Sequence, residues 1–267
     1  MTDDALHWLW IAGCWWALAA YLFLPFLWRH YGNQKKLDGM PMVTHTSVGL
    51  PGDPINVGIV GQLEDIVAAM DVAGWHAADP VTLKSSLHII GSVVMHRAYP
   101  TAPVSPLFYD GRIQDLAFEY PVGESAKRRQ HVRFWKVLVE GDEGRPVWLG
   151  AATFDQAVGF SHYTAQVTHH IAADIDAARD FVIDTLIKAR KAVARYQITG
   201  VGATLNGRNG GGDRYFTDGE IAFARLAPAD QFHDGSPETL PDPPLVVLKN
   251  KLFRNLSNLK HGTLASS

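Results

Sequence analysis

The chain lacks the features that mark several large classes of protein. Cys14 is the only cysteine among 267 residues, so an internal disulfide framework is excluded. The 24 basic and 27 acidic residues nearly cancel, leaving a net charge of −3. This balance shows neither the basic excess of a nucleic-acid-binding protein nor an acidic solvating tail. We therefore expect no nucleic-acid partner.

Short catalytic signatures are missing as well. The sequence contains no GxSxG, HExxH or paired CxxC motif, and no GK[ST] follows its glycines. The best-marked hydrolase, zinc and nucleotide-binding patterns are therefore absent. Histidine is the one residue type in unusual supply, with 12 copies. The length fits one domain of ordinary size plus attachments.

A long apolar stretch lies near the N-terminus. Residues Leu6 to Trp28 hold no charged side chain and exceed the roughly 20 residues that cross a bilayer as a helix. A buried core helix or a cleaved signal peptide is the alternative, but Asp3 and Asp4 precede the stretch where a signal peptide carries positive charge. We predict a single transmembrane helix within an anchor of residues 1–37.

The charges after this stretch predict its orientation. Arg29, Lys35 and Lys36 follow it, and such basic flanks stay on the cytoplasmic side of a membrane. We therefore expect a single-pass protein of the inner, cytoplasmic membrane whose remaining chain faces the cytoplasm.

The rest of the chain divides by composition. Residues 38–53, rich in Gly, Pro, Thr and Met, predict a linker, and 54–227 predict the folded domain. The domain opens with a strand over Ile55–Val60 and a helix over Leu63–Ala73. A helix N-terminus can receive a phosphate, but without a glycine fingerprint a structural role is favoured here. A second amphipathic helix over Thr82–Met95 and a stiff loop with three prolines over 97–106 follow.

The stretch Gly111–Asp155 is the most informative part of the sequence. Apolar and polar residues alternate there through three strand-like segments. Because side chains alternate across a strand, we expect a meander with one apolar and one polar face. The polar face, above small residues such as Ala117 and Ala151, would carry Asp115, Glu119, His131, Arg133 and Asp155. Such a surface can hold a polar ligand.

The elements after the meander complete an α+β domain. The sequence predicts strands over Tyr163–His170, Ile198–Leu205 and Gly219–Leu226, a helix over Ile175–Tyr196, and a mobile surface loop in the glycine-rich run Asn206–Asp213. We expect a mixed or antiparallel sheet of about five strands with helices packed mainly on one side, preceded by one transmembrane helix.

Two pairs of polar residues lie near the start of the helix predicted over Ile175–Tyr196. His169 and His170 are adjacent on a strand and point to opposite faces, so one of them can join the polar face. Asp174 and Asp176 fit the N-cap and the first turn of the helix, a role we favour over metal ligation.

The polar face could support general acid/base or metal chemistry. His131 could act as the acid/base with Asp115 or Asp155 orienting it. A metal site would instead combine His131, one of His169 or His170, and Asp155 or Asp115. The metal and any cofactor stay open.

Anion binding is the third use of this face. Guanidinium forks bind phosphate oxygens, and the candidate ligand-binding residues are Arg112, Glu119, Arg128, Arg129, Arg133, His169 and His170. A purely structural role is also open, in which opposite charges pair across strands and contribute about 0.2 to 1 kcal/mol per pair.

Six separated motifs occur in one order over about Pro54–Ala194: NVGIVG, AGWHAADPVTLKSS, YPTAPVSPLFYDGRIQDLAFEYP, RRQHVRFWK, GRPVWLGAATFD and THHIAADIDAARDF. In this order they resemble the LssY C-terminal domain family. The resemblance implies a membrane context, since other members are fused to membrane segments of the lipid-phosphate phosphatase or DedA type. This chain has one predicted span and lacks the phosphatase signatures PSGH and SRxxxxxHxxxD, so that activity does not carry over.

We therefore expect a membrane-anchored domain that binds an anionic ligand, a phosphorylated lipid or a lipid-linked sugar, with membrane lipid as its partner. One alternative is a hydrolase acting on such a ligand with His131 as general acid/base. Another is a structural module that binds a membrane-protein partner. If His131 and Arg133 line a site, replacing either by alanine should weaken ligand binding or activity and leave thermal stability nearly unchanged, as is usual for exposed polar positions.

Residues 228–267 predict a proline-rich linker and a short basic amphipathic tail. Leu245–Leu259 places leucines at helical spacing, with Lys249, Lys251 and Arg254 elsewhere on the wheel. The leucine stripe could pack on the domain's own sheet or on the anionic cytoplasmic leaflet. Salt would screen only the second kind of binding.

Overall fold

The computed structural model describes residues 3–23, 29–78, 106–123, 128–163, 165 and 167–262. The helix predicted over Thr82–Met95 and residues 97–105 of the proline-containing loop lie outside this part of the chain. The helical elements are α1 (Asp3–Leu18), the π-helical turn η1 (Ala19–Phe23), the 3₁₀ turn η2 (Lys35–Leu37), α3 (Leu63–Val72), α5 (Ile175–Lys188) and α6 (Pro244–Gly262).

The strands are short except for two in the meander. They are β1 (Val43–Thr46), β2 (Pro51–Pro54), β3 (Val57–Val60), β4 (His76–Ala77), β5 (Leu107–Tyr109), β6 (Arg112–Ile113), β7 (Leu116–Pro121), β8 (Arg129–Leu138), β9 (Val147–Phe160), β10 (Val167–Ile171), β11 (Ala192–Thr199), β12 (Thr204–Arg208), β13 (Arg214–Thr217), β14 (Glu220–Leu226) and β15 (Glu238–Thr239).

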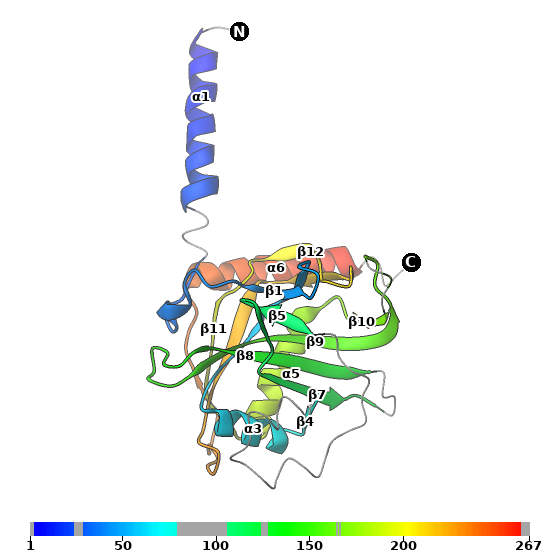
Figure 1. Ribbon diagram of the computed structural model, residues 1–267. Coiled ribbons are helices and arrows are strands. Elements are labelled where there is room, and N and C mark those ends of the chain that lie inside the picture. The colour runs from blue at the N-terminus through cyan, green and yellow to red at the C-terminus, as the bar shows by residue number, and fades with distance from the viewer. Residues whose placement is uncertain are drawn as a thin grey trace.

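One helix extends away from the folded domain (Figure 1). Among the described residues, Asp4–Phe23 is long and apolar enough to span a membrane, and its most apolar window is 0% buried. Its tryptophans Trp8, Trp10 and Trp15 are 65–70% exposed. In water that surface would be unfavourable, and a bilayer would cover it.

A mixed sheet forms the centre of the domain. Its strand order is β15-β11-β14-β3-β9-β8-β7-β4, and β10 pairs with β9. Only β14–β3 and β11–β15 pair in parallel among the described strands of this sheet. The predicted α+β class is confirmed, but the sheet has nine strands rather than about five. Strands as short as β4 and β15, with two residues each, leave no periodic pattern in a sequence.

The sheet separates two apolar layers. On one face, α3 and α5 pack through residues such as Ile66 and Val182. On the other face, Trp135 and Phe223 pack with Leu37 and with Tyr109 of the small sheet β2-β1-β5-β6. The two helices thus share one side of the sheet, as predicted.

Residues 38–53 belong to the folded domain, which corrects the predicted linker. β1 and β2 form an antiparallel hairpin, and β1 pairs with β5. Thr44 is 0% exposed, and its hydroxyl donates a hydrogen bond to the Asp53 carbonyl over 2.8 Å. Of the glycines and prolines that suggested a linker, Gly49 lies in the hairpin turn, and Pro51 and Gly52 belong to β2.

The helix predicted to reach Tyr196 ends at Lys188. Arg190 adopts a left-handed conformation with φ +59°, and strand β11 follows it. Tyr196 then stacks on Phe223 of β14, with 5.1 Å between the ring centroids. Residues 192–198 carry apolar side chains at both helical and alternating spacing, and pairing with β14 selects the strand.

Candidate functional site

Strand register produces the predicted polar face. β8 lies between β7 and β9, so that His131 pairs with Glu119 on one side and with Thr153 on the other. Arg129 lies opposite Asp155 by the same register. Because alternate residues of paired strands point the same way, these five side chains share one face of the sheet.

Arg129 is the centre of a buried charge cluster on this face. Its Nη1 lies 2.7 Å from the Glu119 carboxylate, its Nε lies 3.3 Å from Asp155, and its Nη2 lies 3.3 Å from His169 Nε2. Glu119, Arg129 and Asp155 are at most 3% exposed. Burial raises the pKa of Asp155, although His169, Arg133 and Arg129 act in the opposite direction. Arg129 therefore stabilises the buried carboxylates of Glu119 and Asp155, because a buried charge without a counter-ion costs free energy.

Arg133 forms a second buried pair with Asp53 of β2, at 3.6 Å. Asp53 also accepts a hydrogen bond of 3.3 Å from Asn209 Nδ2, in the loop between β12 and β13. Burial raises the pKa of Asp53, and the Arg133 charge opposes that shift. Neither Asp53 nor Asn209 was predicted as a site residue.

His131 lies on the same face, and its ring is buried there. It is 2% exposed, and its Nε2 has no hydrogen-bond partner in the described part of the chain. Burial lowers the pKa of His131 well below 6.5, and the Arg133 and Arg129 charges and His169 lower it further. The imidazole is therefore neutral at pH 7, with one nitrogen that donates and one that accepts.

A cavity of about 210 Å³ opens over these residues. It is smaller than the roughly 300–1,000 Å³ of sites for drug-sized ligands, so it suits a small polar group. The residues that line it are Thr46, Ser47, Val48, Leu50, Asp53, Pro106, Leu107, His131, Arg133, Thr153, Asp155, Ser161, Thr168, His169, Ile171, Asn209, Gly210 and Gly211.

The glycine-rich run Asn206–Asp213 helps to form a wall of this cavity and is not a mobile surface loop. It contains the turn of the β12–β13 hairpin. Asn209 is 6% exposed, and its side-chain oxygen accepts hydrogen bonds from the Gly211 and Asp213 amides at 3.0 and 2.9 Å. A side-chain amide that bonds nearby backbone fixes such a turn.

Of the ten predicted site residues, four line the cavity, namely His131, Arg133, Asp155 and His169. Glu119, Arg129 and His170 do not line it, and three more have other contacts. Arg112 and Asp115 form an ion pair of 3.5 Å with each other, both partly exposed. Arg128 lies over the Phe154 ring, 5.6 Å from its centroid. None of the three lines the cavity. The two histidines divide as predicted, because His169 lines the cavity and His170 Nδ1 lies 2.7 Å from Asp213.

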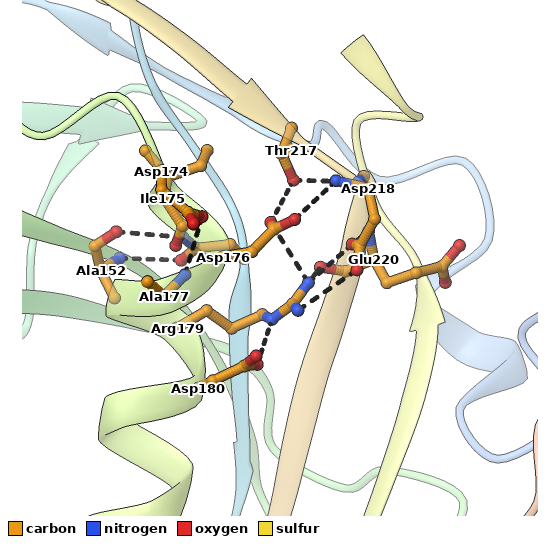
Figure 2. A network of polar contacts seen from close by, with 12 residues as sticks. Ala152, Asp174, Ile175, Asp176, Ala177, Arg179, Asp180, Thr217, Asp218 and Glu220 are labelled. Atoms are coloured by element: carbon orange, nitrogen blue, oxygen red, sulfur yellow. Dashed lines mark hydrogen bonds and ion pairs between the residues drawn. The ribbon is translucent and has the colours of Figure 1, made fainter. Parts of the chain in front are cut away.

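The acidic residues at the start of α5 have structural partners. The Asp174 side chain accepts a hydrogen bond of 3.1 Å from the Ala177 amide, which confirms its predicted role as N-cap. Asp176 accepts hydrogen bonds from the Thr217 hydroxyl and the Asp218 amide (Figure 2). These contacts account for both residues without catalysis.

Burial of His131 gives a testable dependence of stability on pH. Below pH 6.5 the unfolded chain binds a proton at this histidine and the folded chain does not, so its contribution is present above pH 6.5 and is lost as the pH falls below it. Relative to His131→Gln, the wild type should lose at most about 1.4 kcal/mol of unfolding free energy per pH unit. Urea unfolding of a chain beginning at Arg29, between pH 5 and 7.5, measures this loss.

The exposed His45→Gln is the control for loss of one histidine, and parallel pH profiles of wild type and His131→Gln would contradict the assignment. The same burial corrects the expectation that alanine at His131 or Arg133 leaves stability unchanged. These side chains are 2% and 6% exposed, and Arg133→Ala would leave the buried Asp53 without its counter-ion.

A comparison with family models matches residues 37–221 to the family described as LssY C-terminus. The match covers more than half of the chain and includes β1, β2 and all the residues that line the cavity. No curated protein and no solved structure matches the chain significantly.

Proposed function

The chain belongs to the LssY C-terminus family, and on that premise we propose that its domain binds the anionic headgroup of a membrane lipid or lipid-linked sugar in the cavity beside His131. The observation that carries the proposal is the buried His131 Nε2, which has no hydrogen-bond partner in the described part of the chain. A polar group of a ligand would supply that partner, because a buried polar atom left unpaired costs about 1–3 kcal/mol.

The lining favours a ligand that carries hydroxyl groups as well as negative charge. Arg129 and Arg133 are already paired with carboxylates, so the cavity is not a simple cationic pocket. Asp53 and Asp155 can accept hydrogen bonds from hydroxyls, while Arg133 can donate to phosphate oxygens. A phosphorylated sugar or polyol presents both kinds of group.

The arrangement of the domain supports a ligand from the membrane. Figure 1 shows β1, β12 and α6 at the end of the domain from which α1 extends. The described chain resumes after α1 at Arg29, and His30 Nε2 lies 3.7 Å from Glu220. Lys249 of α6 forms an ion pair with the same Glu220. Only residues 24–29 separate His30 from Phe23, a length of chain that spans at most about 25 Å.

The proposal includes a single-pass position in the cytoplasmic membrane with the domain in the cytoplasm. It rests on the apolar helix Asp4–Phe23 and on the basic residues Arg29, Lys35 and Lys36 that follow it. A C-terminal alkaline-phosphatase fusion in a bacterial host should be inactive, and periplasmic activity of that fusion would contradict this orientation.

Blocking the cavity should weaken binding of a headgroup strongly. Ser47 is exposed and lines the cavity, so Ser47→Trp should fill it with little effect on folding. Titration of a sugar 1-phosphate and of glycerol 1-phosphate into the full chain in detergent should give at least tenfold weaker binding for this variant.

The matched control is Ser236→Trp, at an exposed position that does not line the cavity. Equal binding by both variants, or no binding of either probe to the wild type, would contradict the proposal.

A hydrolase that uses His131 is the second candidate, because a neutral imidazole is the form that accepts a proton. Of its proposed orienting carboxylates, Asp155 lines the cavity beside His131 and Asp115 does not, so we keep only Asp155 in this role. Turnover of a generic phosphoester, with and without a divalent metal, separates catalysis from binding. A structural module is the third candidate, and a partner that co-purifies in stoichiometric amount would mark it.

A further inference from the structure

Beyond the cavity, a second group of polar side chains gathers around Asp213. His170 of β10 places its Nδ1 2.7 Å from Asp213 Oδ1, and His162, between β9 and β10, places its Nε2 3.7 Å from the same oxygen. The two imidazole rings lie 5.5 Å apart. One ligand atom from each residue lies within 4.8 Å of the other two. None of the three residues lines the cavity.

The backbone around this trio holds the carboxylate in place. Asp213 Oδ2 accepts a hydrogen bond of 3.1 Å from the Ile171 amide, and the Asp213 amide donates to Asn209 Oδ1. His162 is tied to the same loop, since its amide donates to the Gly211 carbonyl over 2.9 Å. The hydrogen bond from Ile171 fixes the orientation of the carboxylate and leaves Oδ1 to the two histidines.

Glycine makes room for both imidazoles. A Cβ at Gly159 would lie 2.4 Å from His170 Nε2, and a Cβ at Gly212 would lie 2.7 Å from the His162 Cβ. Gly212 also has φ +89°, a conformation that disfavours other residues. A hydrogen bond between His170 and Asp213 would explain two of the three side chains, but it does not explain the position of His162.

We propose that His162, His170 and Asp213 bind a divalent transition-metal ion of the zinc class, with water completing the coordination. Two imidazole nitrogens and one carboxylate oxygen are ligands that Zn²⁺ prefers, at about 2.0–2.2 Å each. In a tetrahedral site such bonds place ligand atoms roughly 3.3 Å apart. The observed separations of 2.7 and 3.7 Å bracket that value, so small side-chain movements suffice.

The ion would link the β9–β10 connection and β10 to the glycine-rich run Asn206–Asp213. Asn209, Gly210 and Gly211 of that run line the cavity, so the metal would hold one cavity wall in position. The metal site does not depend on the proposed headgroup binding, and it stands if the cavity binds nothing.

Calorimetric titration of Zn²⁺ into the full chain, purified in detergent without a polyhistidine tag and stripped with EDTA, tests the site. The wild type should bind one equivalent of Zn²⁺ and should not bind Mg²⁺ comparably, because the hard Mg²⁺ ion prefers oxygen ligands. His162→Ala, His170→Ala and Asp213→Asn should each weaken Zn²⁺ binding at least tenfold. Co²⁺ should give the visible absorption of a tetrahedral complex.

His45→Ala is the matched control, because His45 is an exposed histidine outside the trio. The decisive variant is His162→Ala, since its side chain is 61% exposed and its removal should leave folding intact. Binding by His162→Ala that equals binding by the control, or no binding by the wild type, would overturn the proposal.

Discussion

Arg179→Ala should lower the free energy of unfolding by about 3–5 kcal/mol, the usual cost of removing one partner from a buried ion pair. The Arg179 side chain is 3% exposed. Its Nη1 and Nη2 bond the two oxygens of Asp218 at 2.7 and 3.3 Å, and Nη1 also donates to the Glu220 carbonyl over 3.1 Å. Figure 2 shows how this fork joins the start of α5 to the turn before β14.

The expected loss of unfolding free energy is large because two mostly buried carboxylates would lose their counter-ion. Asp176 and Asp218 have side chains only 17% and 8% exposed. Burial already raises the pKa of Asp176 to about 6, with Asp218 adding to the shift and Arg179 opposing it. Without the guanidinium, both groups would have to take up protons or admit water.

Urea unfolding of the chain that begins at Arg29 measures the loss. Arg112→Ala is the matched control, because Arg112 is 50% exposed in its ion pair with Asp115 and such surface pairs contribute at most about 1 kcal/mol. Similar losses for the two variants would show that the Arg179 cluster is no more than a surface network.

The polar face could be predicted because strand alternation is a local property. Glu119, His131 and Arg133 lie at alternate positions of β7 and β8, and pairing of the strands brings them together. Asp115 obeys the same alternation but precedes β7, and its carboxylate accepts a hydrogen bond of 2.7 Å from the Lys136 amide. Alternation of apolar and polar residues shows which side chains share a face of a strand, but it does not show at which residue the strand begins.

The other half of the candidate site had no local signal. Asp53 and Asn209 are 156 residues apart and meet through one hydrogen bond. Asp53 lies in a segment with glycine and proline and Asn209 in a glycine-rich one, and such compositions are shared by linkers, mobile loops and tight hairpins. These hairpins become cavity walls only through their tertiary contacts with the rest of the domain. The periodicity of apolar residues in the sequence gives no signal for such contacts.

The sequence left two partners open for the leucine stripe of the C-terminal helix, the domain's own sheet and the membrane. α6 packs on the domain through a mixed stripe, which consists of Val246, Lys249, Asn250, Phe253 and Ser257, each at most 8% exposed. Lys249 is buried there because Glu220 supplies its counter-ion. The leucine stripe stays outside this contact, with Leu245, Leu248, Leu252, Leu256 and Leu259 43–72% exposed. The sheet is therefore not the partner of the leucines.

An apolar stripe this long on a water-facing helix is unfavourable unless something covers it. We infer that the membrane of the proposed function covers it, because α6 lies at the end of the domain from which α1 extends (Figure 1). The exposed Lys251 and Arg254 lie on the same helix and would add attraction to an anionic leaflet of about 1 kcal/mol each. Helices with an apolar face and basic residues lie in the membrane interface in this way.

Replacement of Leu248, Leu252 and Leu256 by glutamine should therefore release the domain from membranes. If each half-exposed leucine loses about 1 kcal/mol of burial in the bilayer, the three together weaken binding roughly 100-fold. Cosedimentation with phosphatidylglycerol-containing vesicles measures this for a chain that begins at Arg29. The wild-type chain should bind at low salt and be partly released at high salt, because salt screens the basic residues but not the leucines.

A triple variant of equally exposed apolar residues on other elements provides the control. Val72, Ile113 and Val139 are 48–79% exposed, and their replacement by glutamine should leave vesicle binding unchanged. Because the three leucines lie outside the contact with the domain, the unfolding free energy of their variant should match that of this control. Undiminished vesicle binding by the leucine variant would contradict this role of α6, because the tested chain lacks α1 and another surface of the domain would then have to bind the vesicles.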